Sequence, residues 1–310
     1  MKTIFKLIII LIIFLITSQT DVPDRDFYLS QSSYALNSLS RNLNSPLLIF
    51  KEPTWNLISH FLSFFGNIES TFRYFSFFLY LGNAYIFSNI LDKYLKFKNV
   101  NSYFYKFIFI FSPFFIAMNQ YHLRQGAACL CFMLFVYFNL ERNNYFIKFK
   151  DFSIIFFLLS VTIHLSYFFF IPFYLLSIIV RKLKFNKIRL VLVPISTFLL
   201  YVPTINLAYL IRADKAYGLT ELSNSGIGFI FWFIWLLLLI QKGNLRKSYF
   251  SISLIVFYLI TYFNFHYVGR IIQAFSPLIY IEASNMNLNQ YKILGIIQFL
   301  FVVATLNRIF

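Results

Sequence analysis

Apolar stretches recur along almost the whole chain, and they restrict its fold more than any other feature. They begin at Ile4 and continue nearly to Phe310, and 59% of the 310 residues are hydrophobic. Inside a bilayer no water bonds the backbone, so a crossing segment must satisfy its own polar groups. Runs such as 227–240 are continuous rather than alternating, which favours helices. The sequence therefore predicts an all-α, polytopic integral membrane protein.

Basic residues cluster in short segments between the apolar runs, and the net charge is +16. The clusters are Lys2 and Lys6; Lys93, Lys96 and Lys98; Arg142, Lys148 and Lys150; Arg181, Lys182, Lys184, Lys187 and Arg189; and Lys242, Arg246 and Lys247. This distribution is typical of cytoplasmic loops, which carry an excess of Lys and Arg. A nucleic-acid-binding protein would instead gather basic residues on a folded soluble surface, and no segment is long enough for one. We therefore exclude nucleic acid as a partner.

Taking these clusters as cytoplasmic predicts a cytoplasmic N-terminus and about 11 transmembrane helices. The predicted crossings are 4–17, 71–91, 103–118, 124–140, 152–163, 165–180, 190–207, 227–240, 249–264, 271–283 and 293–306. The first run is also similar to a signal peptide, but no A-x-A-like cleavage site follows it. We expect one membrane domain over 1–310, with an external segment at 18–70 and an external loop near 208–225.

Two apolar stretches fit the distribution of basic residues only if neither crosses the membrane as a single helix. A full crossing at about 46–65 would place Lys93 and its basic neighbours outside, so we expect an outer-face interfacial or re-entrant helix, interrupted at Lys51-Glu52-Pro53. One long helix over 152–180 would likewise move the cluster at 181–189 outside. We therefore expect two short helices that turn near His164. Each is shorter than the roughly 20 residues of a full span, so the turn is expected below the outer surface.

Titratable side chains are predicted to gather at the outer face: His60, His122, His164, His266, Arg124, Arg212 and Arg270. Arg124 and Arg270 each stand where an outer loop re-enters the membrane as the start of a helix, and a cation there opposes the helix dipole. The position is favourable if the guanidinium and the first backbone N–H groups share an anion such as phosphate. The alternatives are snorkelling towards water or an ion pair with an outer-face acid.

Several other chemistries lack support in the sequence. Cys129 and Cys131 lie two residues apart in one predicted helix and face different sides, which indicates packing rather than a disulfide or metal site. No nucleotide-binding loop, dinucleotide glycine pattern, H-E-x-x-H or G-x-S-x-G occurs. The acidic stretch from Asp21 to Asp26 is interrupted by Arg25, so a solvated loop is favoured over a cation site. We predict no cofactor and no metal, which leaves a cofactor-free enzyme or a transporter.

A series of short motifs runs in order along nearly the whole chain: Asp24 and Asp26 ahead of Tyr28 and Tyr34, Glu52-Pro53 before an apolar helix, Arg124-Gln125-x-x-Ala128 at a helix start, His164-x-Ser166 in a Phe-rich hairpin, and Arg270 at the start of a late helix. In this order and spacing the chain resembles the EpsG-like, Wzy-type polymerases of bacterial O-antigen and capsule polysaccharides. Ala127 departs from the pattern, which has a bulkier aliphatic residue there.

The resemblance implies a glycosyltransferase of the bacterial cytoplasmic (inner) membrane with its active site on the extracytoplasmic side. It would polymerise polyprenyl-diphosphate-linked oligosaccharide repeat units, with chain-length regulator and flippase proteins as partners. Arg124 and Arg270 would stabilise the diphosphate leaving group. His164 would be the base for the acceptor hydroxyl, with Asp24 or Asp26 as second candidates. The other predicted substrate-binding residues are Gln125, His122, His266 and Arg212.

Two other classes of protein fit part of this pattern. A flippase or transporter of lipid-linked glycans would also need cations and aromatic residues, but it predicts internal repeats and polar residues near the membrane midplane, and neither is seen. A membrane ligase that transfers finished glycan to another acceptor would share the two arginines, so it stays open beside the polymerase. For His164 the alternative is a structural histidine bonded to a neighbouring helix.

Overall fold

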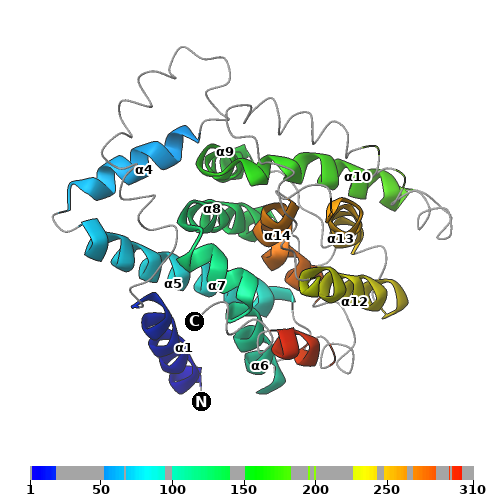
Figure 1. The fold of residues 1–310 in the computed structure, drawn as a ribbon, viewed down its shortest axis with the longest axis horizontal. Coiled ribbons are helices and arrows are strands. Elements are labelled where there is room, and N and C mark those ends of the chain that lie inside the picture. The colour runs from blue at the N-terminus through cyan, green and yellow to red at the C-terminus, as the bar shows by residue number, and fades with distance from the viewer. Residues whose placement is uncertain are drawn as a thin grey trace, which may run out of the picture. The chain divides into compact units, whose positions relative to one another are not determined.

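The computed structural model describes residues 2–18, 52–65, 68–94, 100–139, 151–182, 195, 199, 226–242, 248–263, 268–283, 293 and 295–301. All regular secondary structure in these ranges is helical (Figure 1), which confirms the prediction of an all-α fold. No helix formed by the described residues is both long and apolar enough to cross a membrane. The predicted polytopic arrangement, with about 11 crossings, stays a prediction.

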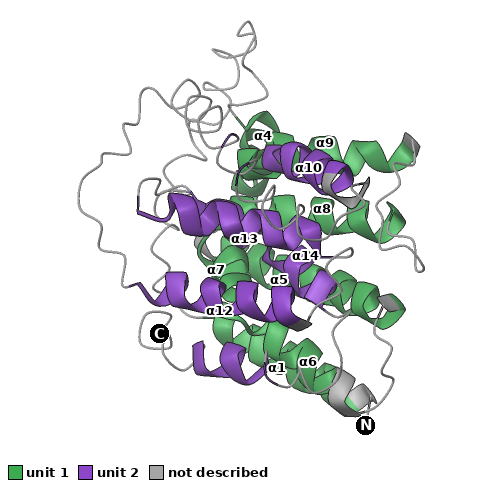
Figure 2. Ribbon diagram, turned by 90° about the vertical axis from the view of Figure 1, so that its right-hand side faces the viewer, with its two compact units in different colours: residues 1–167, 305–310 green, residues 168–304 purple. Residues whose placement is uncertain are grey.

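The chain divides into two compact units, residues 1–167 with 305–310 and residues 168–304 (Figure 2). The first contains α1 (Lys2–Thr17), α4 (Pro53–Ser63), α5 (Ile68–Tyr94), α6 (Val100–Ile110), α7 (Pro113–Gln120), α8 (Leu123–Asn139), η2 (Asp151–Ser153) and α9 (Ile154–Ile163). The second contains α10 (Phe170–Lys182), α12 (Ile227–Lys242), α13 (Tyr249–Thr261) and α14 (Val268–Ala283), and the short helix η3 (Leu165–Phe169) spans the boundary. This division into compact units does not test the predicted single membrane domain over 1–310, which stays a prediction.

In the first unit, α8 packs against α5 and α9, and α4 packs against the same two helices (Figure 1). α5 and α8 run parallel. Asn83 Nδ2 donates to the Gly126 carbonyl at 3.0 Å, and further along both helices Lys93 Nζ donates to the Tyr137 carbonyl at 3.4 Å. The start of α8 and the end of α5 therefore lie at opposite ends of this helix pair.

A buried hydrogen-bond network joins α5, α7 and α8 near the start of α8. Asn83 Nδ2 donates to Asn119 Oδ1 at 2.6 Å, and Ser76 Oγ donates to the Asn119 carbonyl at 2.8 Å. Gly126 completes the junction, because a Cβ there would lie 2.6 Å from the Met118 carbonyl oxygen. The lack of a side chain at this position lets the end of α7 approach the first turn of α8.

The structure divides the predicted crossing at 103–118 into two helices, α6 and α7. Pro113 has no N–H to donate and disfavours helical backbone at Ser112. Ser112 is accordingly extended (φ −66°, ψ 147°), and its hydroxyl accepts a hydrogen bond from Phe115 N at 3.3 Å. A side-chain cap with proline at the first helical position is a common way for a helix to begin.

The second unit is built around α13, which packs against α10, α12 and α14. The rings of Phe170, Phe250 and Phe275 contact one another, with centroids 5.6, 5.7 and 6.4 Å apart. Glu282 of α14 is buried, and its Oε2 accepts hydrogen bonds from Ser251 N at 3.0 Å and Ser251 Oγ at 2.7 Å. The carboxylate thereby caps the first turn of α13, where the helix dipole favours negative charge.

Several predicted boundaries agree with the structure. The crossing at 124–140 corresponds to α8, and α9 ends before His164, where the turn was predicted. The helix predicted near 46–65 is seen as α4, which begins at Pro53. The predicted crossing at 190–207, apart from two of its residues, and the external loop near 208–225 lie outside the described residues.

Candidate functional site

The candidate site is assembled where α7 gives way to α8. At this junction Tyr121 N and His122 N both donate to the Ala117 carbonyl, at 3.0 and 2.9 Å, which closes α7. The chain then turns directly into α8, so Arg124 occupies the first turn. Burial raises the pKa of the Tyr121 hydroxyl above its ordinary value, because desolvation disfavours the phenolate. Tyr121 is therefore a neutral hydroxyl at physiological pH.

Arg124 forms an ion pair with Glu52. Its Nη1 lies 2.6 Å from Glu52 Oε2, and the two side chains are only 16% and 7% exposed. The other carboxylate oxygen, Oε1, accepts a hydrogen bond from Leu165 N at 3.5 Å. One carboxylate therefore ties the start of α4 to the start of α8 and to the turn after α9.

The backbone at Glu52 is in the left-handed region, with φ 52° and ψ 54°. Among the described residues no other non-glycine residue has a positive φ. This conformation costs a residue with a Cβ roughly 1–2 kcal/mol. Pro53 follows as the first residue of α4, where its fixed φ and missing N–H are well tolerated. The strained turn places the Glu52 carboxylate against Arg124.

His164 caps the end of α9 in an extended conformation (φ −150°, ψ 120°) and is 2% exposed. Its backbone N–H donates to the Ser160 carbonyl at 3.0 Å, and its carbonyl accepts from Tyr167 N at 3.2 Å. The ring nitrogen Nδ1 accepts a hydrogen bond from Ser166 N at 3.2 Å. Because Nδ1 is an acceptor here, the neutral ring carries its proton on Nε2. His164 in this state is a hydrogen-bond donor through Nε2.

A second contact holds α4 beside α9. Thr54 Oγ1 donates to Thr162 Oγ1 at 2.8 Å, two residues after Glu52 and three residues before Leu165. Tyr167 OH lies 3.9 Å from Met118 Sδ and connects the turn after α9 to α7. The polar groups around Arg124 therefore lie on packed helices rather than on one isolated loop.

The structure brings together two of the three predicted catalytic residues, Arg124 and His164, through Glu52 and Leu165. Gln125 follows Arg124 and is fully buried, and His122 precedes α8 and is half-buried. Arg270 belongs to the second unit, where it is half-buried in the first turn of α14. The remaining predicted residues, Asp24, Asp26, Arg212 and His266, lie outside the described residues.

Glu52 also belongs to the site, although the sequence indicated it only through the Glu52-Pro53 motif and gave no role for it. Its signal was present, because Lys51-Glu52-Pro53 places an acid in an otherwise apolar stretch, and an outer-face acid was one alternative partner for Arg124. The contact itself joins residues 72 positions apart, so only the packing of α4 shows it.

No protein-family model matches this chain, and no curated protein or solved structure matches it either. The chemistry of the site must therefore be inferred from its own residues. Within the described ranges, no three His, Cys, Asp or Glu side chains are grouped so that they could hold a metal ion. What these ranges offer is a guanidinium, a carboxylate, an imidazole and helix-end N–H groups.

Proposed function

We propose that this chain is a glycosyltransferase of the bacterial cytoplasmic membrane that polymerises polyprenyl-diphosphate-linked oligosaccharide repeat units at the outer face. The observation that carries the proposal is the buried cluster of Arg124, Glu52 and the His164 turn. It places a guanidinium in the first turn of α8, close to the turn that carries His164, and a cation at the start of a helix is suited to a departing diphosphate.

The distribution of polar and apolar side chains supports the membrane setting. On α1 the exposed residues include Ile4, Leu11 and Leu15, which are 63, 58 and 57% exposed. The buried side chains of the first unit, by contrast, include Asn83, Asn119 and Gln125. An apolar outer face around a partly polar interior suits lipid and is unfavourable in water.

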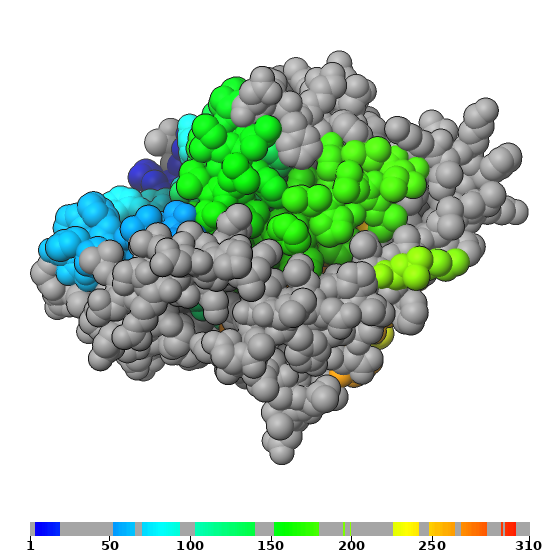
Figure 3. All heavy atoms as spheres, turned by 90° about the horizontal axis from the view of Figure 1, so that it is seen from above, coloured from blue at the N-terminus to red at the C-terminus, as the bar shows by residue number. Residues whose placement is uncertain are grey.

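The face of α4 that lies away from α5 and α9 supports the predicted interfacial helix. Leu57 and Phe61 of α4, and Phe64 directly after its last residue, are 50, 60 and 71% exposed and recur at helical spacing. Figure 3 shows α4, in light blue, at the surface that is seen from above. An exposed apolar stripe beside a buried charged pair fits a helix that lies in the membrane surface and covers a site.

In the proposed reaction, a hydroxyl oxygen of the new repeat unit attacks the anomeric carbon at the lipid-linked end of the growing chain. The bond between that carbon and the diphosphate oxygen breaks, and its electron pair leaves with the diphosphate. Arg124 stabilises the charge that grows on this leaving group. A guanidinium has five N–H donors in a rigid fork, so it can bind a carboxylate and a phosphate together. Glu52 sets the plane of that fork.

The hydrogen bond at Nδ1 favours a role for His164 other than that of the base expected from the sequence. With Nδ1 accepting from Ser166 N, the neutral ring is protonated at Nε2 and is a donor rather than a base. We propose that it donates a hydrogen bond to the departing diphosphate. The proton of the attacking hydroxyl then goes to a carboxylate, for which Asp24 and Asp26 are the candidates. Arg270 is proposed as the second cation at the diphosphate.

The decisive experiment is genetic complementation in a strain that lacks the gene. Loss of the gene should leave single lipid-linked repeats and remove the ladder of longer glycans. Arg124→Lys should restore almost none of the ladder despite keeping the charge, because the forked geometry is lost. Arg73→Lys, at another half-buried arginine of the first unit, is the matched control and should restore it.

Other outcomes of the same experiment identify the alternative functions. Repeats that accumulate on the cytoplasmic leaflet would indicate a flippase, because translocation precedes polymerisation. A normal lipid-linked ladder that never reaches its final acceptor would indicate a ligase. Unchanged ladders in both Arg124→Ala and Arg270→Ala would overturn the assignment of these residues to the diphosphate.

A further inference from the structure

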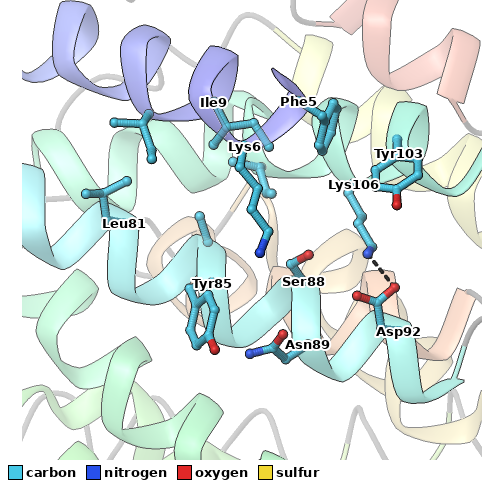
Figure 4. A pocket seen from close by; sticks show the side chains of 13 residues that line it. Phe5, Lys6, Ile9, Leu81, Tyr85, Ser88, Asn89, Asp92, Tyr103 and Lys106 are labelled. Atoms are coloured by element: carbon cyan, nitrogen blue, oxygen red, sulfur yellow. Dashed lines mark hydrogen bonds and ion pairs between the residues drawn. The ribbon is translucent and has the colours of Figure 1, made fainter. Parts of the chain in front are cut away.

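A cavity of about 600 Å³ lies between α1, α5 and α6 in the first unit (Figure 4). Its lining includes Lys6 from α1, Asp92 from α5 and Lys106 from α6. Lys106 is buried and lies 2.5 Å from Asp92 Oδ1, whereas the Asp92 side chain is 60% exposed. None of these residues belongs to the site around Arg124, so the cavity needs its own explanation.

Polar residues gather at one end of the lining and aliphatic residues at the other. On α5, Ser88 and Asn89 adjoin Asp92, whereas Leu81 and Ala84 line the other end. Leu81 is separated from Asp92 by about 16 Å at the rise of an α-helix. In Figure 4, Lys6 and Lys106 lie towards Asp92 and Ile9 lies towards Leu81. The Phe5 ring also lines the polar end, where it contacts Tyr103 with ring centroids 5.0 Å apart. The cavity is therefore amphipathic along its length.

The polar end of the cavity carries a net positive charge, because two lysines line it against one aspartate. Figure 4 shows Lys6 and Lys106 extending from different helices towards α5. Two ammonium groups and the hydroxyls of Ser88 and Tyr103 are suitable donors to one phosphate. A free phosphate would leave the apolar end unexplained, so the ligand should also have a hydrocarbon chain.

The polar end also lies at the opposite end of the α5–α8 pair from Arg124, since these helices run parallel and Arg124 is in the first turn of α8. In the proposed topology the site around Arg124 faces outward, and this end, beside Lys93, faces the cytoplasm. We infer that the cavity binds one anionic phospholipid of the cytoplasmic leaflet, with its phosphate between Lys6 and Lys106 and an acyl chain along Leu81 and Ala84. The inference rests on the membrane setting proposed above and not on glycosyl transfer.

The inference is tested by native mass spectrometry of the full chain in detergent, with phosphatidylglycerol, phosphatidylcholine or inorganic phosphate added. We expect one phosphatidylglycerol per chain, retained about tenfold more tightly than phosphatidylcholine, because the choline ammonium of phosphatidylcholine would lie beside two lysines and be repelled by them. Equal retention of the two lipids would overturn the inference. So would binding of inorganic phosphate that phosphatidylglycerol does not displace.

Three variants locate the bound lipid. Lys6→Gln changes an exposed side chain and should weaken phosphatidylglycerol retention about tenfold. Ala84→Phe fills the apolar end and should abolish retention, with size-exclusion elution and thermal unfolding as the check of folding. Lys93→Gln removes a cation at the same end of α5 but outside the cavity lining, and should leave retention unchanged. If Lys6→Gln retains phosphatidylglycerol as tightly as the unaltered chain does, the placement of the phosphate beside Lys6 is wrong.

Membrane fractionation separates this inference from the proposed function. A chain that sediments with membranes and supports the glycan ladder, but retains no phosphatidylglycerol, would overturn the lipid site alone. A chain that retains the lipid but does not support the ladder would overturn the glycosyltransferase proposal alone. A chain absent from the membrane fraction would overturn both.

Discussion

Glu52 Oε2 lies 2.6 Å from Arg124 Nη1, although the two residues are 72 positions apart in the sequence. The same carboxylate accepts a hydrogen bond from Leu165 N, directly after His164. A single acid therefore holds the start of α4, the start of α8 and the turn after α9 in one place. The site depends on this contact as much as on the residues that would touch substrate.

Removal of Arg124 should destabilise the protein by leaving the Glu52 carboxylate buried without its cation. For Arg124→Ala we expect a loss of about 3 kcal/mol in the free energy of unfolding, measured by denaturant titration in detergent. The double variant Glu52→Gln/Arg124→Met should be less destabilised than the sum of its single variants, because both charges are gone. If the losses in the free energy of unfolding are additive, the ion pair between Glu52 and Arg124 contributes little to stability.

The left-handed backbone at Glu52 predicts a difference between two small replacements. Glu52→Gly and Glu52→Ala both remove the carboxylate, but only glycine adopts a positive φ without steric cost. Glu52→Gly should therefore be more stable than Glu52→Ala by about 1 kcal/mol in the same unfolding measurement. An alanine variant at least as stable as the glycine variant would contradict the strained turn.

Gly126 should tolerate no side chain. In Gly126→Ala the new Cβ would lie 2.6 Å from the Met118 carbonyl oxygen, so α7 and α8 must separate, and we expect a loss of about 2 kcal/mol. Gly269→Ala is the matched control, because nothing lies within 4 Å of its Cβ position. There the helix preference of alanine should raise stability by about 0.5 kcal/mol. Equal effects at both positions, read by thermal unfolding, would contradict the close approach of α7 and α8.

His164→Asn and His164→Gln should separate the structural and chemical roles of the ring. An Asn Oδ1 can replace Nδ1 as the acceptor for Ser166 N, so His164→Asn should keep stability but lose most of the glycan ladder. The Gln amide can reach the position of Nε2 and donate, so His164→Gln should retain more ladder than His164→Asn. The reverse order, on equal amounts of membrane-inserted protein, would remove Nε2 from the reaction.

Glu282 should contribute to stability without affecting glycan synthesis. Glu282→Ala leaves Ser251 N and its hydroxyl without the acceptor that caps α13, and we expect a loss of about 2 kcal/mol in the free energy of unfolding. Glu282→Gln keeps an acceptor oxygen and should lose less. A glycan ladder lost in Glu282→Gln at normal protein levels would show that this carboxylate has a second role.

The sequence alone determined the helical fold class and many of the breaks between helices. Long apolar runs favour helices, and α8 and the end of α9 at His164 follow from local patterns of apolar and charged residues. Pro113 carried a local signal as well, because a proline ends the preceding helix. Arg124 and His164 could be selected from the sequence because a charged or titratable side chain beside an apolar run is unusual.

Only the tertiary structure decided what these side chains contact. The partner of Arg124 is Glu52, which no local pattern specifies, because the pair forms only when α4 packs against α9. The tautomer of His164 depends on the backbone turn that brings Ser166 N to Nδ1. The cavity lined by Lys6 forms only where α1, α5 and α6 meet. Periodicity is encoded by neighbouring residues, whereas an ion pair or a cavity depends on segments that meet only in the folded chain.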